Sequence, residues 1–167
     1  MLTMALDRLK QLSAHEIGHT IGLAHNFAAS SNNRASVMDY PHPYITMEDN
    51  QPNFKNAYDN KIGAWDKRAI IYGYGEPPID QEEESFLGNL ISENKENGQL
   101  FITDQDARPA GSLHPYAHLW DNGNDPIAEL ERMMILRKHV LDNLNEKALA
   151  NDMPSSCLLY TSDAADE

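Results

Sequence analysis

The sequence is poor in cysteine, in positive charge and in long apolar runs. Its single cysteine, Cys157, leaves no partner within the chain for a disulfide bond and no set of thiolates for a zinc site. Lysine and arginine number 13 against 26 acidic residues, and the net charge of -13 disfavours binding to nucleic acid or to anionic membranes. No apolar run approaches the roughly 20 residues of a membrane-spanning helix. The composition is therefore that of a globular protein that acts away from those two surfaces.

Both ends of the chain give expectations of their own. Residues 1–14 have the apolar spacing of an amphipathic helix rather than of an export signal, so we expect any such signal to lie upstream of this sequence. Residues 157–167 resemble the translation of a sequencing-library adapter. We therefore expect residues 154–167 to form a disordered tail, with 157–167 foreign to the natural protein.

Residues 15–25 read His-Glu-Ile-Gly-His-Thr-Ile-Gly-Leu-Ala-His and follow a run of leucines at helical spacing. The spacing predicts one helix from about residue 3 to residue 23. Residues four apart on a helix project in nearly the same direction, so His15 and His19 can clamp one metal ion. Glu16 points about 100° away from His15, where it can hydrogen-bond a water on the metal and act as a general base.

A third ligand is needed, because catalytic zinc generally has three protein ligands and keeps a fourth position for water. His25 can supply it if the helix ends after His19 and the chain turns back sharply. Gly22 lies between the two histidines and can adopt the positive φ that such a turn requires. The pattern predicts a zinc site formed by three histidines, with a glutamate beside it.

The stretch resembles the metzincin zinc peptidases, whose motif is H-E-x-x-H-x-x-G-x-x-H followed by a methionine turn. The resemblance implies one catalytic Zn2+ ion bound by His15, His19 and His25. Residues 36–40, Ser-Val-Met-Asp-Tyr, look like the methionine turn, in which Met38 packs beneath the three histidines as an apolar floor.

Tyr40 stands two residues after Met38, where some metzincin subfamilies have a tyrosine that approaches the metal or stabilises an oxyanion. The resemblance implies that role for Tyr40, beside Glu16 as the general base. It also implies metal-assisted hydrolysis of peptide bonds, with a protein or a peptide as the substrate.

Four further segments resemble large bacterial zinc-dependent metallopeptidases, in which the catalytic module lies deep in a long secreted polypeptide: residues 25–27, 39–41, 65–67 and 118–123. The resemblance implies that the parent protein acts in the extracellular space or the periplasm. A metzincin domain normally places a twisted sheet before the zinc helix and holds the substrate along its edge strand. We therefore expect the chain to be the C-terminal part of an α+β catalytic domain whose N-terminal sheet is missing, and the isolated fragment to be inactive or poorly folded.

The remaining patterns predict a mainly α fold with long ordered loops. Residues 26–60, rich in Asn, Ser, Pro and Asp, predict such a loop, and residues 61–72 predict a helix that ends at Gly73. We expect a short strand at residues 100–103. A further helix should begin at Asp125 and Pro126 and run to about residue 150.

These patterns divide the chain into two regions. Residues 1–75 are expected to form the zinc-binding part, with the active-site helix, the methionine turn and the next helix. Residues 76–153 are expected to form a helical C-terminal extension, and the acidic stretch at its start is expected to be peripheral.

Other interpretations stay open. In a gluzincin-type peptidase, a distant acid such as Glu48 replaces His25 as the third ligand. In a non-catalytic module, the metal serves folding or partner binding; Glu16 argues against this, because a structural site gains little from a poised base. His114 and His118 also have the spacing of a helical ligand pair, but the proline between them favours a structural or surface role.

Overall fold

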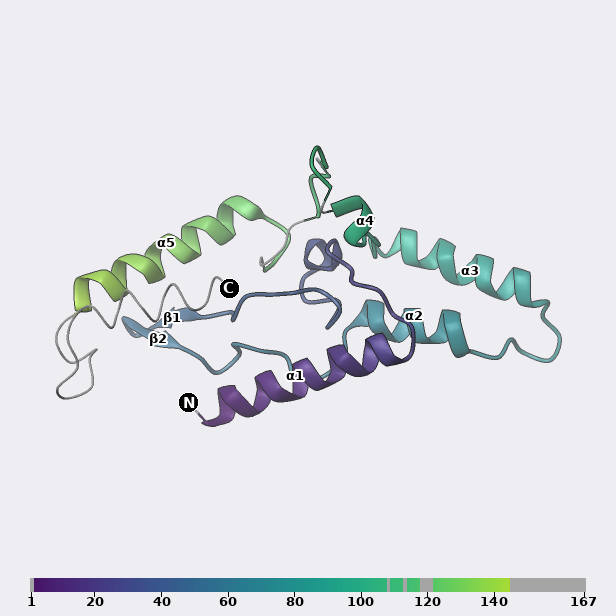
Figure 1. Cartoon of the computed structure of the whole chain (residues 1–167), viewed down its shortest axis with the longest axis horizontal. Coiled ribbons are helices and arrows are strands. Elements are labelled where there is room, and N and C mark those ends of the chain that lie inside the picture. The colour runs from purple at the N-terminus through teal and green to yellow at the C-terminus, as the bar shows by residue number, and fades with distance from the viewer. Residues whose placement is uncertain (1, 108, 113, 118–121, 145–167) are drawn as a thin grey trace. The chain divides into compact units, whose positions relative to one another are not determined.

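The computed structural model describes residues 2–107, 109–112, 114–117 and 122–144 (Figure 1). These residues are mainly helical and include one small antiparallel sheet of two strands, so the prediction of a mainly α fold with long loops is confirmed. The elements in chain order are α1 (Leu2–Thr20), the 3-10 helix η1 (Ala29–Asn32), β1 (Thr46–Glu48), β2 (Gln51–Asn53), α2 (Ala64–Tyr74), α3 (Glu83–Glu96), α4 (Asp104–Ala107) and α5 (Pro126–Asn143).

The chain divides into two compact units, residues 1–130 and 131–167, and the first contains every residue discussed below for the metal site. Helix α5 begins as predicted, because Asp125 Oδ1 accepts hydrogen bonds from the N–H groups of Ile127 (2.9 Å) and Ala128 (3.2 Å). The predicted end of that helix near residue 150 and the predicted tail lie outside the described residues. No helix in the described part of the chain combines the length and the apolar character that crossing a membrane requires.

Helix α1 ends at Thr20, earlier than the sequence pattern predicts. The chain leaves the helix through Gly22, whose φ is 88°. The Leu23 N–H donates to the Gly18 carbonyl (2.9 Å), and the Gly22 N–H donates to the His19 carbonyl (3.0 Å). These two bonds form a Schellman motif, which requires a left-handed residue at the position that Gly22 occupies. The sharp turn after His19 is therefore fixed locally.

A polar stripe of α1, rather than its leucines, packs against the rest of the unit. The leucines of the predicted apolar face are exposed, from 37% for Leu12 to 76% for Leu2. The buried residues recur at helical spacing on one face: Asp7, Gln11, His15 and Gly18. Helix α1 therefore packs through the side that carries a proposed metal ligand.

The long loop after α1 is ordered and supplies much of the core. The core cluster joins loop residues to one tryptophan of α2: Ala29, Ala35, Val37, Met38 and Trp65. The loop also contains a hairpin, β1 and β2, that the sequence pattern does not predict. Its turn residues Asp49 and Asn50 both have positive φ, 49° and 59°, as a type I′ turn requires. Short polar side chains tolerate that conformation better than most.

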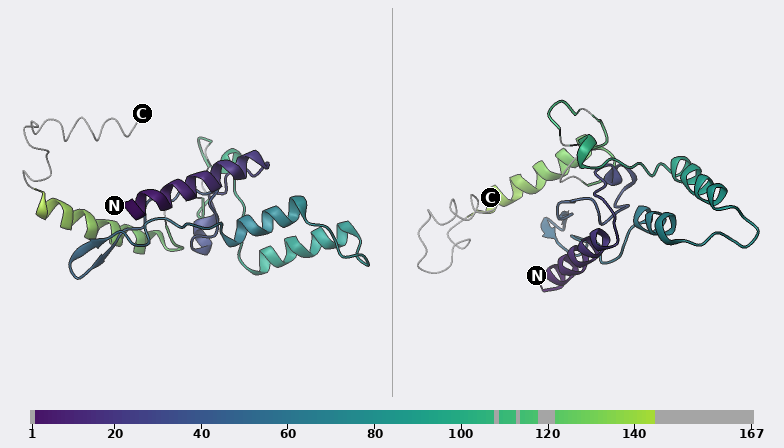
Figure 2. Two further views of the ribbon diagram at one scale, coloured as in Figure 1. Left: turned by 90° about the horizontal axis from the view of Figure 1, so that it is seen from below. Right: turned by 45° about the vertical axis from the view of Figure 1, so that its right-hand side comes forward.

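Helix α2 ends at Tyr74 with Gly75 as its C-cap, two residues later than the predicted cap at Gly73, and the Gly75 N–H donates to the Ile71 carbonyl at 2.8 Å. The acidic stretch after it contains α3, a helix that the sequence patterns do not predict. Helix α3 lies beside α2 (Figure 2), and Arg68 of α2 forms a 2.6 Å ion pair with Glu93 of α3. The acidic first turn of α3 lies where the helix dipole favours negative charge.

Residues 100–103 form no strand, contrary to the prediction, although they do pair with the loop that follows α1. The Phe27 N–H donates to the Ile102 carbonyl at 2.8 Å. The Ile102 N–H donates instead to the side-chain oxygen of Asn26, at 3.1 Å. One of the two hydrogen bonds of Ile102 thus goes to a side-chain amide rather than to the backbone of a neighbouring strand. The segment is therefore paired without forming a strand.

Asp66 of α2 ties that helix to the loop that carries the methionine turn. The residue is 2% exposed, and its carboxylate accepts three hydrogen bonds, from Ser36 Oγ (2.5 Å), Val37 N–H (2.9 Å) and Gly63 N–H (2.6 Å). The Gly63 bond caps the start of α2, and the other two hold the loop. A side chain at Gly63 would collide with the Ala35 backbone, so only glycine lets the two segments meet here.

We expect Asp66→Asn to lower the free energy of unfolding by about 2 to 4 kcal/mol, because an amide nitrogen replaces one acceptor and strands buried N–H groups. Urea unfolding measures the change. Asp80→Asn removes the same charge from an exposed position and is the matched control, expected to change stability by less than about 0.5 kcal/mol. If the two variants are equally stable, the Asp66 carboxylate does not hold the loop.

Candidate metal centre

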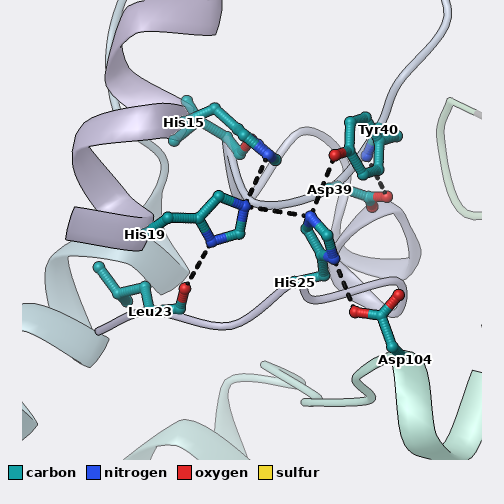
Figure 3. A network of polar contacts seen from close by, with 8 residues as sticks. His15, His19, Leu23, His25, Asp39, Tyr40 and Asp104 are labelled. Atoms are coloured by element: carbon teal, nitrogen blue, oxygen red, sulfur yellow. Dashed lines mark hydrogen bonds and ion pairs between the residues drawn. The ribbon is translucent and has the colours of Figure 1, made fainter. Parts of the chain in front are cut away.

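Three imidazole rings converge at the C-terminal end of α1 (Figure 3). His15 and His19 lie one turn apart on the helix, and the turn at Gly22 brings His25 back toward them. The Nε2 atom of His19 lies 3.1 Å from Nε2 of His15 and 3.2 Å from Nε2 of His25. The ligand atoms of all three lie within 4.8 Å of one another. The structure thus brings together the three histidines that the sequence singles out as ligands.

The two helical histidines are each held from the far side of the ring by a backbone carbonyl. Nδ1 of His15 lies 2.6 Å from the Val37 carbonyl oxygen, and Nδ1 of His19 lies 2.9 Å from the Leu23 carbonyl oxygen. A carbonyl oxygen only accepts hydrogen bonds, so in each neutral ring the hydrogen is on Nδ1. Nε2 then carries a free lone pair that faces the other rings.

His25 is held by a side chain. Its Nδ1 lies 2.6 Å from Oδ2 of Asp104, a residue 79 positions away in the sequence. Sequence reasoning missed Asp104, because nothing in its local pattern distinguishes it from any other aspartate at the start of a helix. The contact joins a residue of the expected zinc-binding part, residues 1–75, to a residue of the expected C-terminal extension.

The donor set fits a zinc ion. In three neutral rings with the hydrogen on Nδ1, each Nε2 atom has a lone pair and no hydrogen. The lone pairs repel one another, so their close approach is favourable only around a cation. Two nitrogens bound to one tetrahedral zinc at about 2.0–2.1 Å lie about 3.3 Å apart. The separations of 3.1 and 3.2 Å from His19 to its two neighbours are close to that value.

Burial keeps His15 in the neutral form that binds metal. The residue is 3% exposed, and burial lowers the pKa of His15 below its ordinary value of 6.5. The hydrogen bond to Val37 raises the pKa, whereas the neighbouring His19 and His25 lower it further. At a given pH, His15 is therefore protonated to a smaller extent than a histidine in water.

Met38 packs against α1 between the two helical ligands. It is fully buried, and a Cβ atom at Gly18 would collide with its Sδ. Gly18 lies between His15 and His19 in the chain, so the missing side chain lets the thioether reach the helix backbone there. Sequence reasoning missed Gly18, because the zinc motif leaves its position free and only the contact with Met38 reveals the constraint.

Tyr40 lies at the edge of the same cluster. Its hydroxyl oxygen is 3.1 Å from Nε2 of His25, and its ring centroid lies 4.8 Å from that of His25 and 4.9 Å from that of His15. The carboxylate of Asp39 fixes the backbone here by accepting hydrogen bonds from the N–H groups of Tyr40 (2.8 Å) and Ser30 (3.1 Å). The phenol therefore lies beside the space that the Nε2 atoms face.

The two glutamates considered from the sequence lie in different places. Glu16 follows His15 on α1 and is exposed to solvent. Glu48 ends β1, where its carboxylate accepts a 2.5 Å hydrogen bond from the Asn53 side chain. Among the described residues, the metal-ligating group consists of the three histidines and does not include Glu48.

Of the second histidine pair, His114 and His118, the structure describes only His114. His114 is exposed, and its Nδ1 accepts a hydrogen bond from the Tyr116 N–H at 3.2 Å. His118 lies outside the described residues, so a surface role for the pair stays a prediction.

The geometry is that of a three-histidine metal site, formed by the last turn of a helix and the loop that follows it. A family model described as Met-zincin matches residues 1–160, and the chain therefore belongs to this Met-zincin family. The resemblance to metzincin zinc peptidases is confirmed, and the mainly helical fold with a small sheet is compatible with part of a metzincin domain. No curated protein and no solved structure matches the chain significantly. The family and the three converging histidines together indicate a zinc metallopeptidase.

We expect Gly18→Ala to lower the free energy of unfolding by about 1 to 3 kcal/mol, because the added methyl group overpacks the contact with Met38. The clash outweighs the roughly 1 kcal/mol that alanine gains over glycine inside a helix. In a Met38→Ala background the space is open, so the same change becomes neutral or stabilising. A cost that is equal in both backgrounds, measured by urea unfolding, rules out the methionine contact as its cause.

We expect His25→Ala to weaken zinc binding by a factor on the order of 100 or more, because the ion loses one of three protein ligands. Competition with a chromogenic chelator measures the affinity. His114→Ala makes the same change at an exposed position and should leave the affinity unchanged. If Glu48→Ala weakens zinc binding and His25→Ala does not, the gluzincin-type ligand set is correct.

Proposed function

We propose that this chain carries the catalytic centre of a zinc-dependent endopeptidase. The observation that carries the proposal is the convergence of three Nε2 atoms, on rings whose Nδ1 atoms already have acceptors. Structural zinc sites are almost always closed by four protein ligands, whereas catalytic sites have three and keep one position open. A cluster of three histidines among the described residues supports the second kind of site.

His15, His19 and His25 would hold the ion. All three are neutral ligands, so they leave its double positive charge uncompensated. When bound, zinc supplies a Lewis acid that activates a water molecule and polarises the scissile carbonyl group. His19 is exposed and His25 is partly exposed, so a substrate can approach the cluster from the solvent side.

Glu16 is the proposed general base. It accepts a proton from the attacking water and later passes that proton to the leaving amine. Its place directly after His15 on α1, together with its exposure to solvent, supports this role. A site that only stabilised the fold would gain little from a poised base in that place.

Tyr40 is the proposed donor to the developing oxyanion. Its hydroxyl group lies 3.1 Å from Nε2 of His25 and is therefore at the rim of the metal site. A phenol O–H at that position can donate to the carbonyl oxygen as negative charge builds up on it. Backbone bonds through Asp39 hold the tyrosine in place, so little reorganisation accompanies the reaction.

The proposed substrate is a protein or a peptide. We place the activity outside the cytoplasm, in the extracellular space or the periplasm. The likeness of the surrounding segments to large secreted bacterial metallopeptidases supports that location.

We expect Glu16→Gln to lower kcat by about 10²- to 10⁴-fold, because the amide cannot take up the proton, and to leave zinc binding intact. Hydrolysis of casein by the full-length protein measures the rate, and chelator competition measures the affinity. Glu84→Gln, an exposed glutamate on α3, is the matched control and should keep full activity.

Three outcomes decide between the candidate functions. Loss of hydrolysis on chelation, with recovery on adding zinc, supports the peptidase. Equal rates for wild type and Glu16→Gln end the assignment of Glu16. A wild-type protein that binds zinc tightly but hydrolyses nothing supports a zinc-stabilised interaction module instead.

A further inference from the structure

We propose that Asp104, the first residue of α4, is a positioning residue of the metal centre. It would hold the His25 ring in the tautomer and the orientation that a ligand needs. The inference rests on the proposed zinc site and adds to it a residue from a distant part of the chain.

The three histidines are not held alike. The acceptors for His15 and His19 are backbone carbonyls, which form whenever the helix end and the methionine turn are folded. His25 depends on a side-chain carboxylate at 2.6 Å. A carboxylate acceptor gives a stronger hydrogen bond than a carbonyl and makes the imidazole a better electron donor to a metal.

The exposure of His25 and Asp104 indicates whether their contact mainly stabilises the fold or mainly orients the His25 ring. The side chain of His25 is 17% exposed and that of Asp104 is 39% exposed. Solvent screens a contact between side chains this exposed, and even a fully ionised pair would typically contribute less than about 1 kcal/mol to the stability of a fold. The contact therefore has little value as a stabilising bridge. Fixing the orientation of the His25 ring is a larger effect, because three rings must bind the same ion and orientation decides whether the third one reaches it.

Asn26, the residue next to His25, binds the segment that leads into Asp104. Asn26 is fully buried, donates through Nδ2 to the Leu100 carbonyl (2.9 Å) and accepts at Oδ1 from the Ile102 N–H (3.1 Å). The Phe27 N–H adds a bond to the Ile102 carbonyl at 2.8 Å.

These three hydrogen bonds determine where His25 lies relative to the Asp104 carboxylate. The residues on the C-terminal side of His25 hold the residues on the N-terminal side of Asp104, so the two side chains are placed by the same set of bonds. A ring stack in the same segment, Phe101 on Trp65 with centroids 5.4 Å apart, attaches it to α2 as well. The segment around residue 102 is therefore attached both to the residues that follow His25 and to α2.

Zinc affinity of the intact chain tests the proposal, with chelator competition as the measurement. We expect Asp104→Ala to weaken zinc binding by about 10- to 100-fold, as the loss of an outer partner of a metal-bound histidine does. Asp104→Asn should fall between this variant and wild type, because its amide oxygen still accepts the Nδ1 hydrogen but lacks the charge. Asp106→Ala removes an exposed aspartate from the same helix and should bind zinc as wild type does.

A second measurement separates positioning from general damage to the fold. In the zinc-loaded protein, the His25 ring N–H proton should give a protected downfield NMR signal in wild type and in Asp104→Asn, and none in Asp104→Ala. Thermal unfolding of the metal-free protein should be the same for all four proteins. If Asp104→Ala unfolds more easily without metal, in proportion to its loss of zinc affinity, the role is structural and the proposal is overturned.

The outcomes also separate this proposal from the proposed function. If wild type binds zinc and Asp104→Ala binds it equally well, the positioning role falls and the peptidase assignment stands. If zinc binds and depends on Asp104 but no peptide is cleaved, the positioning role stands and the peptidase assignment falls. If wild type binds no zinc, both fall.

Discussion

The candidate metal centre depends on a set of hydrogen bonds at Nδ1 of each imidazole, on the side of the ring that faces away from the other two histidines. Nε2 of His19 lies 3.1 Å from one neighbouring nitrogen and 3.2 Å from the other, a separation that neutral rings of this tautomer would avoid without a cation between them. Acceptors at Val37, Leu23 and Asp104 turn each ring so that its lone pair faces inward. Because a metal ion binds well only when all its ligands are already in place, these acceptors determine the quality of the site.

The acceptors depend in turn on the surrounding fold. The Val37 carbonyl is in place because the carboxylate of Asp66 binds the N–H group of the same residue and the hydroxyl of Ser36. The Leu23 carbonyl is in place because the helix breaks through the left-handed Gly22. One buried charge and one glycine thus set two of the three rings, and both act through backbone groups that are hard to displace.

The three histidines also differ in their exposure to solvent. His15 is buried against the methionine turn, His25 is intermediate, and His19 is exposed. Burial lowers the pKa of His15, so protons compete for this ring less readily than for a histidine in water. His19 faces solvent and Tyr40 lies beside His25, so the exposed side of the cluster is where the proposed substrate would approach.

The sequence by itself determined what depends on neighbours within a few residues. The pairing of His15 with His19, the turn at Gly22 and the cap at Asp125 all follow from helical geometry and backbone preference, which are local properties. The same patterns missed α3, the β1 and β2 hairpin and the end of α2 at Tyr74, because polar segments carry weak periodic signals.

Only the tertiary structure decided which distant groups complete the site. The carboxylate of Asp104 reaches His25 across 79 positions, and Asp66 reaches the methionine turn across 29 or 30. Gly18 must be a glycine only because Met38 packs against it. In each case the partner is chosen by how the loops pack over α1, and no pattern along the chain encodes a contact between residues that far apart.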